Sequence, residues 1–198
     1  MQPDETPAEP GGCPPVAGRA EPPGGDPRGS GPGAGIAAGR VRWLAMPFAE
    51  LPPLLLYQAL ALRSSVFVVE QHCVYQDLDG HDLDALIIVG RQDSAHAGSE
   101  IVATARLLAP GTRFADPSIG RVCTAAAHRG VGLGRALVVE AIRHARERHP
   151  GQPIRISAQA YLRAFYRQLG FEVDSEPYLE DGIAHLEMVR RWDTPAAI

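Results

Sequence analysis

The pattern of apolar and polar positions divides the chain into a part that can form a core and a part that cannot. Glycine and proline dominate residues 1–39, whose only large aliphatic residues are Val16 and Ile36. Such a segment buries too little apolar surface to offset the entropy that it loses on ordering. The alternative, a proline-rich arm that binds a partner, lacks a clear P-x-x-P run with flanking arginines. We predict a disordered tail over 1–39, a folded domain over 40–193 and a short C-terminal tail over 194–198.

Apolar residues that recur every three or four positions predict the helices. One such stripe spans residues 53–69, and Pro53 suits the first turn of a helix. A second stripe begins at Leu133 and ends before Pro150, with arginines in its last turn that complement the helix dipole. A third, shorter helix is predicted over residues 161–169.

Short apolar runs between these helices predict the strands. Three consecutive strands favour an antiparallel meander, whereas the later strand-helix-strand unit requires a parallel pair. We predict an α/β (α+β) fold, in which a mixed, mostly antiparallel central sheet carries helices on both faces. The predicted strands are 41–44, 85–89, 100–108, 118–124, 154–158, 171–173 and 183–189, with a turn over 92–99.

Composition and charge narrow the range of functions. The 198 residues carry a formal net charge of −4, so no strong positive field attracts nucleic acid or an anionic membrane. Cys13, Cys73 and Cys123 are far apart and form no Cys-x-x-Cys pair, so we expect free thiols and no metal site. A secretory signal and an apolar run of about 20 residues are both absent from the sequence. We therefore expect a cytoplasmic protein that binds neither membrane nor nucleic acid.

The segment from Arg129 to Gly134 has the character of an anion-binding turn that opens the second long helix. Its glycines let backbone N–H groups approach a ligand, and the helix N-terminus adds unpaired donors and partial positive charge, which suits a pyrophosphate. A P-loop would need Lys and Ser/Thr where Arg135 and Ala136 stand, and a dinucleotide fingerprint needs G-x-G-x-x-G instead of G-x-G-x-G. A glycine turn without a ligand is the third interpretation.

This turn resembles the signature of the GNAT superfamily of N-acetyltransferases, Gln/Arg-x-x-Gly-x-Gly/Ala, in which Arg129, Gly132 and Gly134 fill the defined positions. The resemblance implies the GNAT (acyl-CoA N-acyltransferase) fold and acetyl-CoA as cosubstrate. The pyrophosphate would bind the amides of the turn, and pantetheine would bind the preceding strand. The amide of Cys123 or Thr124 would polarise the thioester carbonyl. The implied cofactor-binding residues are Val122, Cys123, Thr124, Arg129, Gly130, Val131, Gly132, Leu133, Gly134, Arg135 and Gln159.

A second motif supports the same family. Residues 159–171 resemble Asn-x-x-Ala-x-x-x-Tyr-x-x-x-Gly-Phe, with Tyr166, Gly170 and Phe171 in place, although Gln159 replaces Asn and Leu replaces Ala. A phenol with a pKa of about 10 stays protonated at neutral pH and can donate a proton to a leaving thiolate. Tyr166 is therefore either the general acid or a core aromatic on a short helix.

A third block is similar to the ElaA-type branch of the superfamily. Residues 60–82 resemble Leu-Arg-x-x-Val-Phe-Val-Val-Glu-Gln-x-Cys-x-Tyr-x-Asp-x-Asp-Gly, and residues 178–185 resemble Tyr-x-Glu-Asp-Gly-Ile-x-His. The resemblance covers about residues 41–190. One departure lies at residues 82–86, where the branch has a longer stretch with a histidine before the next strand.

The acceptor side of the site is less well marked. Glu70 and Gln71 end the first long helix, where an acceptor amine would enter, and Glu70 is either a base for its ammonium or part of a solvated helix end. His185 is likewise either a base or a strand histidine in a hydrogen bond. A nearby group of aspartates fails the calcium-loop pattern and either shapes a polar turn or favours a cationic substrate. These are Asp77, Asp79, Asp82 and Asp84.

Together the motifs predict an N-acetyltransferase that moves the acetyl group of acetyl-CoA to a primary amine by direct transfer in a ternary complex. The acceptor is a small-molecule or peptide amine, and a homodimer is an expectation from the resemblance. Three alternatives stay open: an acetyl-enzyme on Cys123, a non-catalytic acyl-CoA-binding sensor or scaffold, and a transferase for a longer acyl chain.

Overall fold

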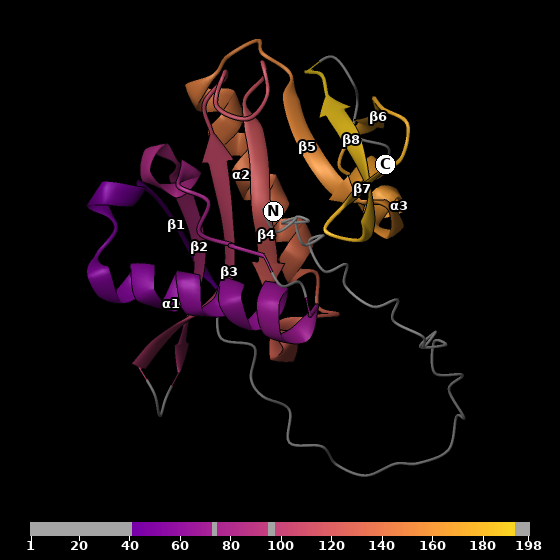
Figure 1. Cartoon of the computed structure of the whole chain (residues 1–198). Coiled ribbons are helices and arrows are strands. Elements are labelled where there is room, and N and C mark those ends of the chain that lie inside the picture. The colour runs from indigo at the N-terminus through magenta and orange to yellow at the C-terminus, as the bar shows by residue number, and fades with distance from the viewer. Residues whose placement is uncertain (1–40, 73–74, 95–97, 193–198) are drawn as a thin grey trace, which may run out of the picture. The chain divides into compact units, whose positions relative to one another are not determined.

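The apolar runs pair into one eight-stranded sheet within the part of the chain that the computed structural model describes, residues 41–72, 75–94 and 98–192. Its order is β1-β2-β3-β4-β5-β8-β6, and β7 pairs with β8 (Figure 1). All neighbouring strands are antiparallel except β4 and β5. The strands are β1 (Arg42–Pro47), β2 (Leu86–Ser94), β3 (Gly98–Leu108), β4 (Ser118–Thr124), β5 (Ile154–Gln159), β6 (Glu172–Val173), β7 (Tyr178–Glu180) and β8 (Ile183–Arg190). The predicted tails lie outside the described residues.

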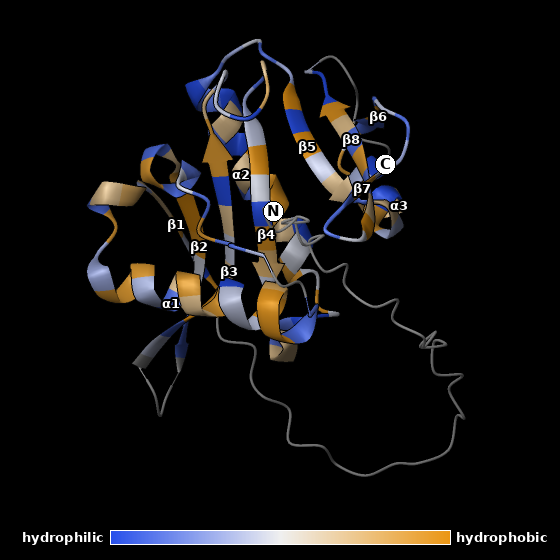
Figure 2. Cartoon of the chain, in the orientation of Figure 1, coloured by the Kyte–Doolittle hydropathy of each residue, from blue (hydrophilic) through white to orange (hydrophobic). Residues whose placement is uncertain are grey.

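Two long helices cover the two faces of the sheet, as predicted. Leu55 and Ala59 of α1 belong to a buried cluster on one face, and Leu137, Val138 and Ala141 of α2 belong to the larger cluster on the other. Figure 2 shows the apolar character of β2 and β3, which lie between these helices. The helices are α1 (Pro53–Arg63), which continues as a π-helical segment (Ser64–Glu70), α2 (Leu133–Arg148) and α3 (Arg163–Arg167).

The parallel pair β4 and β5 opens into a wedge. The two strands pair only at Ser118 and Arg155 and then separate (Figure 1). In β4 the register against β3 shifts because Arg121 and Val122 together face the single residue Ala105, and Arg121 has a φ of 52°. An extra residue of this kind bends its strand and increases the local twist. The bulge thus lies where β4 turns away from β5.

The structure differs from several of the predicted elements. The helix predicted over 161–169 is a 3-10 turn followed by the five residues of α3. The predicted turn over 92–99 is shorter, because β2 and β3 continue pairing to its ends. Strand β7 was not predicted: its Leu179 is 76% exposed, so no buried run marks it, and the strand instead owes its place to a hairpin. The hairpin turn Asp181-Gly182 has φ values of 51° and 77°, as a two-residue type I′ turn requires.

One helical stretch, Pro53–Glu70, is long and apolar enough by composition to cross a membrane, which the sequence analysis did not anticipate. Within the domain, however, Leu55 and Ala59 pack on the sheet and Arg63 is buried in ion pairs. An ion-paired arginine in the middle of the stretch and an apolar face against the sheet are features of a helix that covers a core.

Candidate functional site

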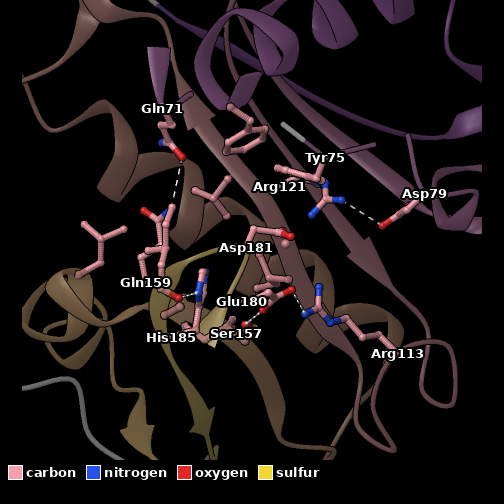
Figure 3. A pocket seen from close by; sticks show the side chains of 18 of the residues that line it. Gln71, Tyr75, Asp79, Arg113, Arg121, Ser157, Gln159, Glu180, Asp181 and His185 are labelled. Atoms are coloured by element: carbon pink, nitrogen blue, oxygen red, sulfur yellow. Dashed lines mark hydrogen bonds and ion pairs between the residues drawn. The ribbon is translucent and has the colours of Figure 1, made fainter. Parts of the chain in front are cut away.

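A cavity of about 330 Å³ lies in the wedge between β4 and β5. Its walls come from the π-helical segment and the loop after it, from both splayed strands, from α3 and from the β7–β8 hairpin (Figure 3). The bulge in β4 thus exposes strand edges that a regular sheet would pair, and segments distant in the sequence meet around them.

The glycine turn lies at the start of α2. Gly132 is the N-cap residue of α2 with a φ of 84°, Gly130 has a φ of 77°, and no side chain caps the helix. A Cβ atom at Gly130, Gly132 or Gly134 would meet nothing within 4 Å, so the approach to these backbone groups is open. Leu133 is buried in the core and anchors the helix, whereas Val131 is 78% exposed. Uncapped N–H groups, a positive helix end and open space fit a diphosphate.

Glu70 lies beside this turn and not in the cavity wall. Its carboxylate accepts hydrogen bonds of 2.6 and 2.9 Å from Arg129, whose guanidinium also donates to the carbonyl oxygen of Thr124. The hydrogen bonds from Arg129 lower the pKa of Glu70. Glu70 is therefore held as an ionised partner of Arg129, and this environment makes it a weaker base.

Two of the predicted β4 residues differ in their surroundings. Val122 lines the cavity, whereas Cys123 is 5% exposed, and burial raises the pKa of its thiol to about 12. The nucleophile of a thiol is its thiolate, so a thiol with this pKa is a poor one at neutral pH. Cys123 is thus placed as a core residue of the strand.

Tyr166 lines the cavity from α3 and is 7% exposed. Its ring makes edge-on contacts with Phe165 and Phe171, at centroid distances of 5.0 and 5.8 Å. Burial raises the pKa of the phenol to about 12, so the proton stays on the oxygen at neutral pH. The packing also fixes the ring, as positioning of a proton donor requires.

Gln159 and Gln71 meet across the cavity. The Gln159 amide donates a 3.2 Å hydrogen bond to Gln71 (Figure 3). Its oxygen accepts one from Tyr161. This contact connects the end of β5 to the segment that follows the π-helical turn. Gln159 is therefore at the junction of the predicted cofactor and acceptor sides.

The β7–β8 hairpin brings a polar cluster that the sequence analysis missed. Glu180 accepts hydrogen bonds of 2.7 Å from Arg113 and 2.9 Å from Ser157, and the hydroxyl of Ser157 lies 2.6 Å from that of Tyr178. Burial would raise the pKa of Glu180, but these hydrogen bonds and the charge of Arg113 outweigh it and hold the pKa below its ordinary value. The sequence Glu180-Asp181-Gly182 could have indicated this cluster, but in the sequence it served only as part of the resemblance to ElaA-type proteins.

His185, a predicted acceptor-side residue, also lines the cavity. Its Nδ1 lies 2.9 Å from the carbonyl oxygen of Ile183, and its ring stacks on Tyr178 at a centroid distance of 6.1 Å. These contacts agree with the interpretation as a hydrogen-bonded strand histidine, while its place in the wall keeps it within reach of a substrate.

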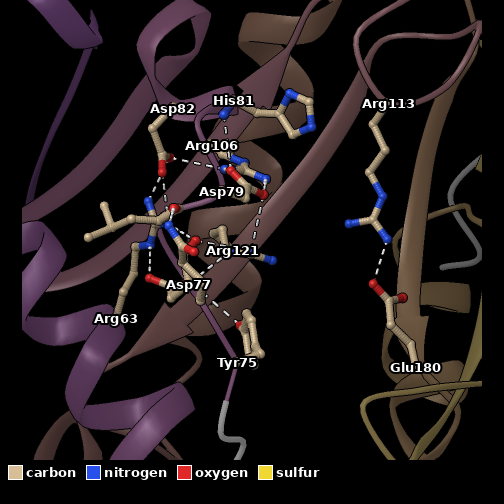
Figure 4. A network of polar contacts seen from close by, with 12 residues as sticks. Arg63, Tyr75, Asp77, Asp79, His81, Asp82, Arg106, Arg113, Arg121 and Glu180 are labelled. Carbon is tan, nitrogen blue, oxygen red and sulfur yellow. Dashed lines mark hydrogen bonds and ion pairs between the residues drawn. The ribbon is translucent and has the colours of Figure 1, made fainter. Parts of the chain in front are cut away.

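Three of the four aspartates are held in a closed ring of alternating charges with Arg63, Arg106 and Arg121 (Figure 4). Each arginine contacts two aspartates at 2.6 to 3.2 Å, and Arg63 and Arg106 are 2% exposed. The suggestion that these carboxylates favour a cationic substrate is therefore wrong for the three, because their charges are already neutralised. They are Asp77, Asp79 and Asp82.

The ring was not predictable from spacing, because its arginines lie on three different elements. It ties the segment after the π-helical turn to α1, to β3 and, through Arg121, to the bulge in β4. Among the described residues, no three His, Cys, Asp or Glu side chains are grouped so as to hold a metal ion.

Comparison with known families and proteins gives a consistent result. The family model described as an acetyltransferase (GNAT) domain matches residues 66–191. Protein ElaA of Escherichia coli is 39% identical over 152 residues, which cover 76% of this chain and 96% of ElaA. A UPF0039 protein of Synechocystis is 40% identical over 151 residues, with coverages of 76% and 96%.

Solved structures agree with this relationship and with the predicted fold. The crystal structure of an acyl-CoA N-acyltransferase from Pseudomonas aeruginosa matches with a TM-score of 0.71 and 39% identity, over 76% of this chain and 99% of that one. The crystal structure of Escherichia coli ElaA matches with a TM-score of 0.70 and 38% identity, over 77% and 100%. The chain therefore belongs to the GNAT acetyltransferase family, with ElaA and the UPF0039 proteins among its relatives, and is an acyltransferase.

Proposed function

We propose that this protein transfers the acetyl group of acetyl-CoA to a primary amine by direct attack in a ternary complex. The observation that carries the proposal is the order of three features along one opening. Strand β4 splays from β5 and lines the cavity together with Tyr166, and it ends at Thr124, shortly before the uncapped start of α2. A diphosphate, an extended pantetheine arm and a reacting thioester need these features in the same order.

The cofactor side is built from backbone groups. Nothing lies within 4 Å of a Cβ atom built on Gly130, Gly132 or Gly134. Arg135 places positive charge at the same turn, and Arg129 would do so when it separates from Glu70. The pantetheine arm would pair with the freed edge of β4 near Val122. Acetyl-CoA supplies the activated acyl group, while the chain orients it and supplies a proton donor.

Tyr166 has the properties that a general acid in this reaction needs. When the amine attacks the carbonyl carbon, the carbon–sulfur bond breaks and the thiolate takes up a proton. A buried phenol with a raised pKa keeps that proton until a strong base forms beside it. Direct transfer is favoured over an acetyl-enzyme because the Cys123 thiol is buried and has a raised pKa.

Release of free thiol from acetyl-CoA, measured with a panel of primary amines, tests the proposal. Every cationic side chain other than histidine in this chain is arginine, so no lysine can be acetylated in the blank reaction. We expect amine-dependent thiol release and an N-acetylated product by mass spectrometry. A scaffold or sensor would bind coenzyme A but release no thiol. Thiol release only from acyl-CoA donors with a longer chain would show that the transferred group is that longer acyl group and not acetyl.

The variant Tyr166→Phe separates the acid from a purely structural tyrosine. We expect turnover to fall at least about tenfold, because general acid catalysis contributes about 10²–10⁴-fold, with little change in coenzyme A affinity by calorimetry. Tyr57→Phe is the matched control, since Tyr57 is 71% exposed on α1. Unchanged turnover in Tyr166→Phe would remove Tyr166 from the mechanism.

A further inference from the structure

The ion pair between Arg113 and Glu180 differs from the other charges in the cavity. Asp79 and Arg121 also line the cavity, but both are locked into the ring by further ion pairs. Asp181 lines it too, but it lies exposed in the hairpin turn after β7. Arg113 and Glu180 form a pair of 2.7 Å whose side chains are 32% and 34% exposed, and no other ion pair of either is found among the described residues. This pair can separate without breaking the ring.

The two members of the pair come from opposite sides of the wedge. Arg113 lies in the segment between β3 and β4, and Glu180 ends β7. Both also line a second, smaller cavity of about 80 Å³ that adjoins the first, with Ser157 and His185 in both walls. In Figure 3 the Glu180 carboxylate lies between Ser157 and Arg113. An acceptor that reaches the thioester from this side must pass or replace the pair.

We propose that Arg113 and Glu180 form the binding site for the acceptor, an amine that also carries a carboxylate. Their ion pair separates when the acceptor binds, so that Glu180 binds the ammonium and Arg113 binds the carboxylate. The inference rests on the proposed function and names its substrate class, an amino acid or a peptide terminus whose amine and carboxylate both lie within the cavity.

Glu180 is prepared to keep its position after Arg113 leaves. The hydroxyl of Ser157 donates to one carboxylate oxygen at 2.9 Å, and Tyr178 lies 2.6 Å from the same hydroxyl. Because the single proton of Ser157 points to Glu180, Tyr178 donates to Ser157 in this chain of hydrogen bonds. The other carboxylate oxygen, which now accepts from Arg113, is the one that an ammonium would take.

The exchange of partners explains why the acceptor needs both charges. An ammonium alone would displace Arg113 and leave a guanidinium two-thirds buried without its carboxylate, which costs free energy. A carboxylate on the same acceptor restores that partner, in the two-pronged geometry that guanidinium prefers. An amine without a carboxylate must therefore break the Arg113–Glu180 ion pair and gains only one new pair. An amino acid breaks the same ion pair and forms two new ones.

Matched acceptors test this directly on the full chain with acetyl-CoA. The probes are L-phenylalanine, L-phenylalaninamide and 2-phenylethylamine, and, for a longer reach, L-lysine, L-lysinamide and cadaverine. We expect at least one series in which kcat/KM for the amino acid exceeds that for its amide and its amine by tenfold or more. If, in both series, kcat/KM for the amide and for the amine equals or exceeds that for the amino acid, the inference is overturned and the proposed function stays intact. Acetylation of no amine would overturn both.

Variants of Arg113 distinguish recognition from a structural role. Arg113→Gln should lower kcat/KM for the amino acid at least tenfold, mainly through KM. It should leave or improve the value for the amine, because Glu180 is then free. Arg113→Lys should recover part of the amino-acid preference. An equal loss for all three forms, with an unchanged melting temperature and coenzyme A affinity, would contradict the proposed contact.

Discussion

Single side chains in this site acquire their chemistry from the groups that surround them. Glu70 and Cys123 have side chains that can act as a base and as a nucleophile. Glu70, however, is held in an ion pair with Arg129, and Cys123 is buried. Glu180, by contrast, is a carboxylate in the cavity wall, oriented by Ser157 and Arg113. The position of each group, more than its residue type, decides which carboxylate is available to an acceptor.

Replacing Cys123 by alanine tests direct transfer. We expect turnover within about twofold of the wild type, because a thiol whose pKa is raised to about 12 supplies almost no thiolate at neutral pH. Thiol release measures turnover, and intact-protein mass spectrometry after incubation with acetyl-CoA alone checks for an acetylated chain. An acetyl group on Cys123 in the wild type, or lost turnover in a folded variant, would favour the acetyl-enzyme.

Replacing Glu70 by glutamine separates its two possible roles. On the proposed function, the Glu70 carboxylate would compete with the diphosphate for Arg129 and repel its charge, so the variant should bind coenzyme A more tightly. Because both side chains are about 40% exposed (40% and 44%), solvent screens the pair and the gain should be at most about fivefold. Calorimetry measures the affinity, with the exposed Glu50→Gln as control. Weaker binding would refute the competition, and a large loss of kcat alone would make Glu70 the base.

Among the structural elements, the segment from Tyr75 to Asp84 depends on charge more than on apolar burial. Its aspartates form the ring with Arg63, Arg106 and Arg121, which come from α1, β3 and β4. Burial alone would raise the pKa of Asp79, but the hydrogen bond and charge of Arg106, with the charge of Arg121, lower it well below its ordinary value. The ring thereby fixes the bulge that opens the wedge.

Replacing Asp82 by asparagine tests the ring. Asp82 is 3% exposed and binds Arg63 at 2.7 Å, so the variant leaves a buried guanidinium short of a counter-charge. Breaking a buried pair in this way costs about 3–5 kcal/mol of unfolding free energy, which a urea titration measures. Asp84→Asn is the matched control from the same turn, because Asp84 is exposed and should change stability by at most about 0.5 kcal/mol. Equal effects of the two variants would show that the ring does not stabilise the fold.

Strands and helices with a buried face were predictable because their apolar residues repeat at a fixed period. This applies to α2, whose Leu137, Ala141 and Ala145 are fully buried. Strand β2 was predictable because it begins with an unbroken apolar run over residues 86–89. The period does not report a π-helical turn, since α1 and the segment after it present one continuous stripe. The apolar period also gives no indication of β7, because the pairing of β7 depends on the turn at Asp181 and Gly182.

For the domain as a unit, burial of the Tyr166 phenol couples the protonation of this group to the stability of the fold. The pKa of Tyr166 is raised to about 12, against an ordinary value of about 10 in the unfolded chain. The neutral phenol is thus favoured in the folded state, and this contribution is fully present below pH 10 and lost as the pH rises through about 12. The chain contains no lysine, so no ammonium side chain titrates in this window, and the other phenols and the thiols are common to the wild type and a Tyr166 variant.

Denaturant unfolding of the wild type and Tyr166→Phe at a series of pH values checks this coupling. Between about pH 10 and 12 the free energy of unfolding of the wild type should fall more than that of the variant, by on the order of 2 kcal/mol. The difference between the two proteins removes the contribution of Cys123, which changes in the same direction. Parallel curves would show that Tyr166 titrates normally and is not desolvated.

Sequence alone was sufficient for the order of the elements that have a buried face, for the two covered faces of the sheet and for the glycine turn before α2, because each depends on a local pattern of a few neighbouring residues. The partners of the charged side chains required the folded chain. Arg113 and Glu180 are 67 positions apart and Arg129 and Glu70 are 59 apart, and no local pattern reports which distant segments approach one another. Burial and electrostatic pairing act through space, so they decide which carboxylate is engaged, which thiol is inert and where an acceptor can bind.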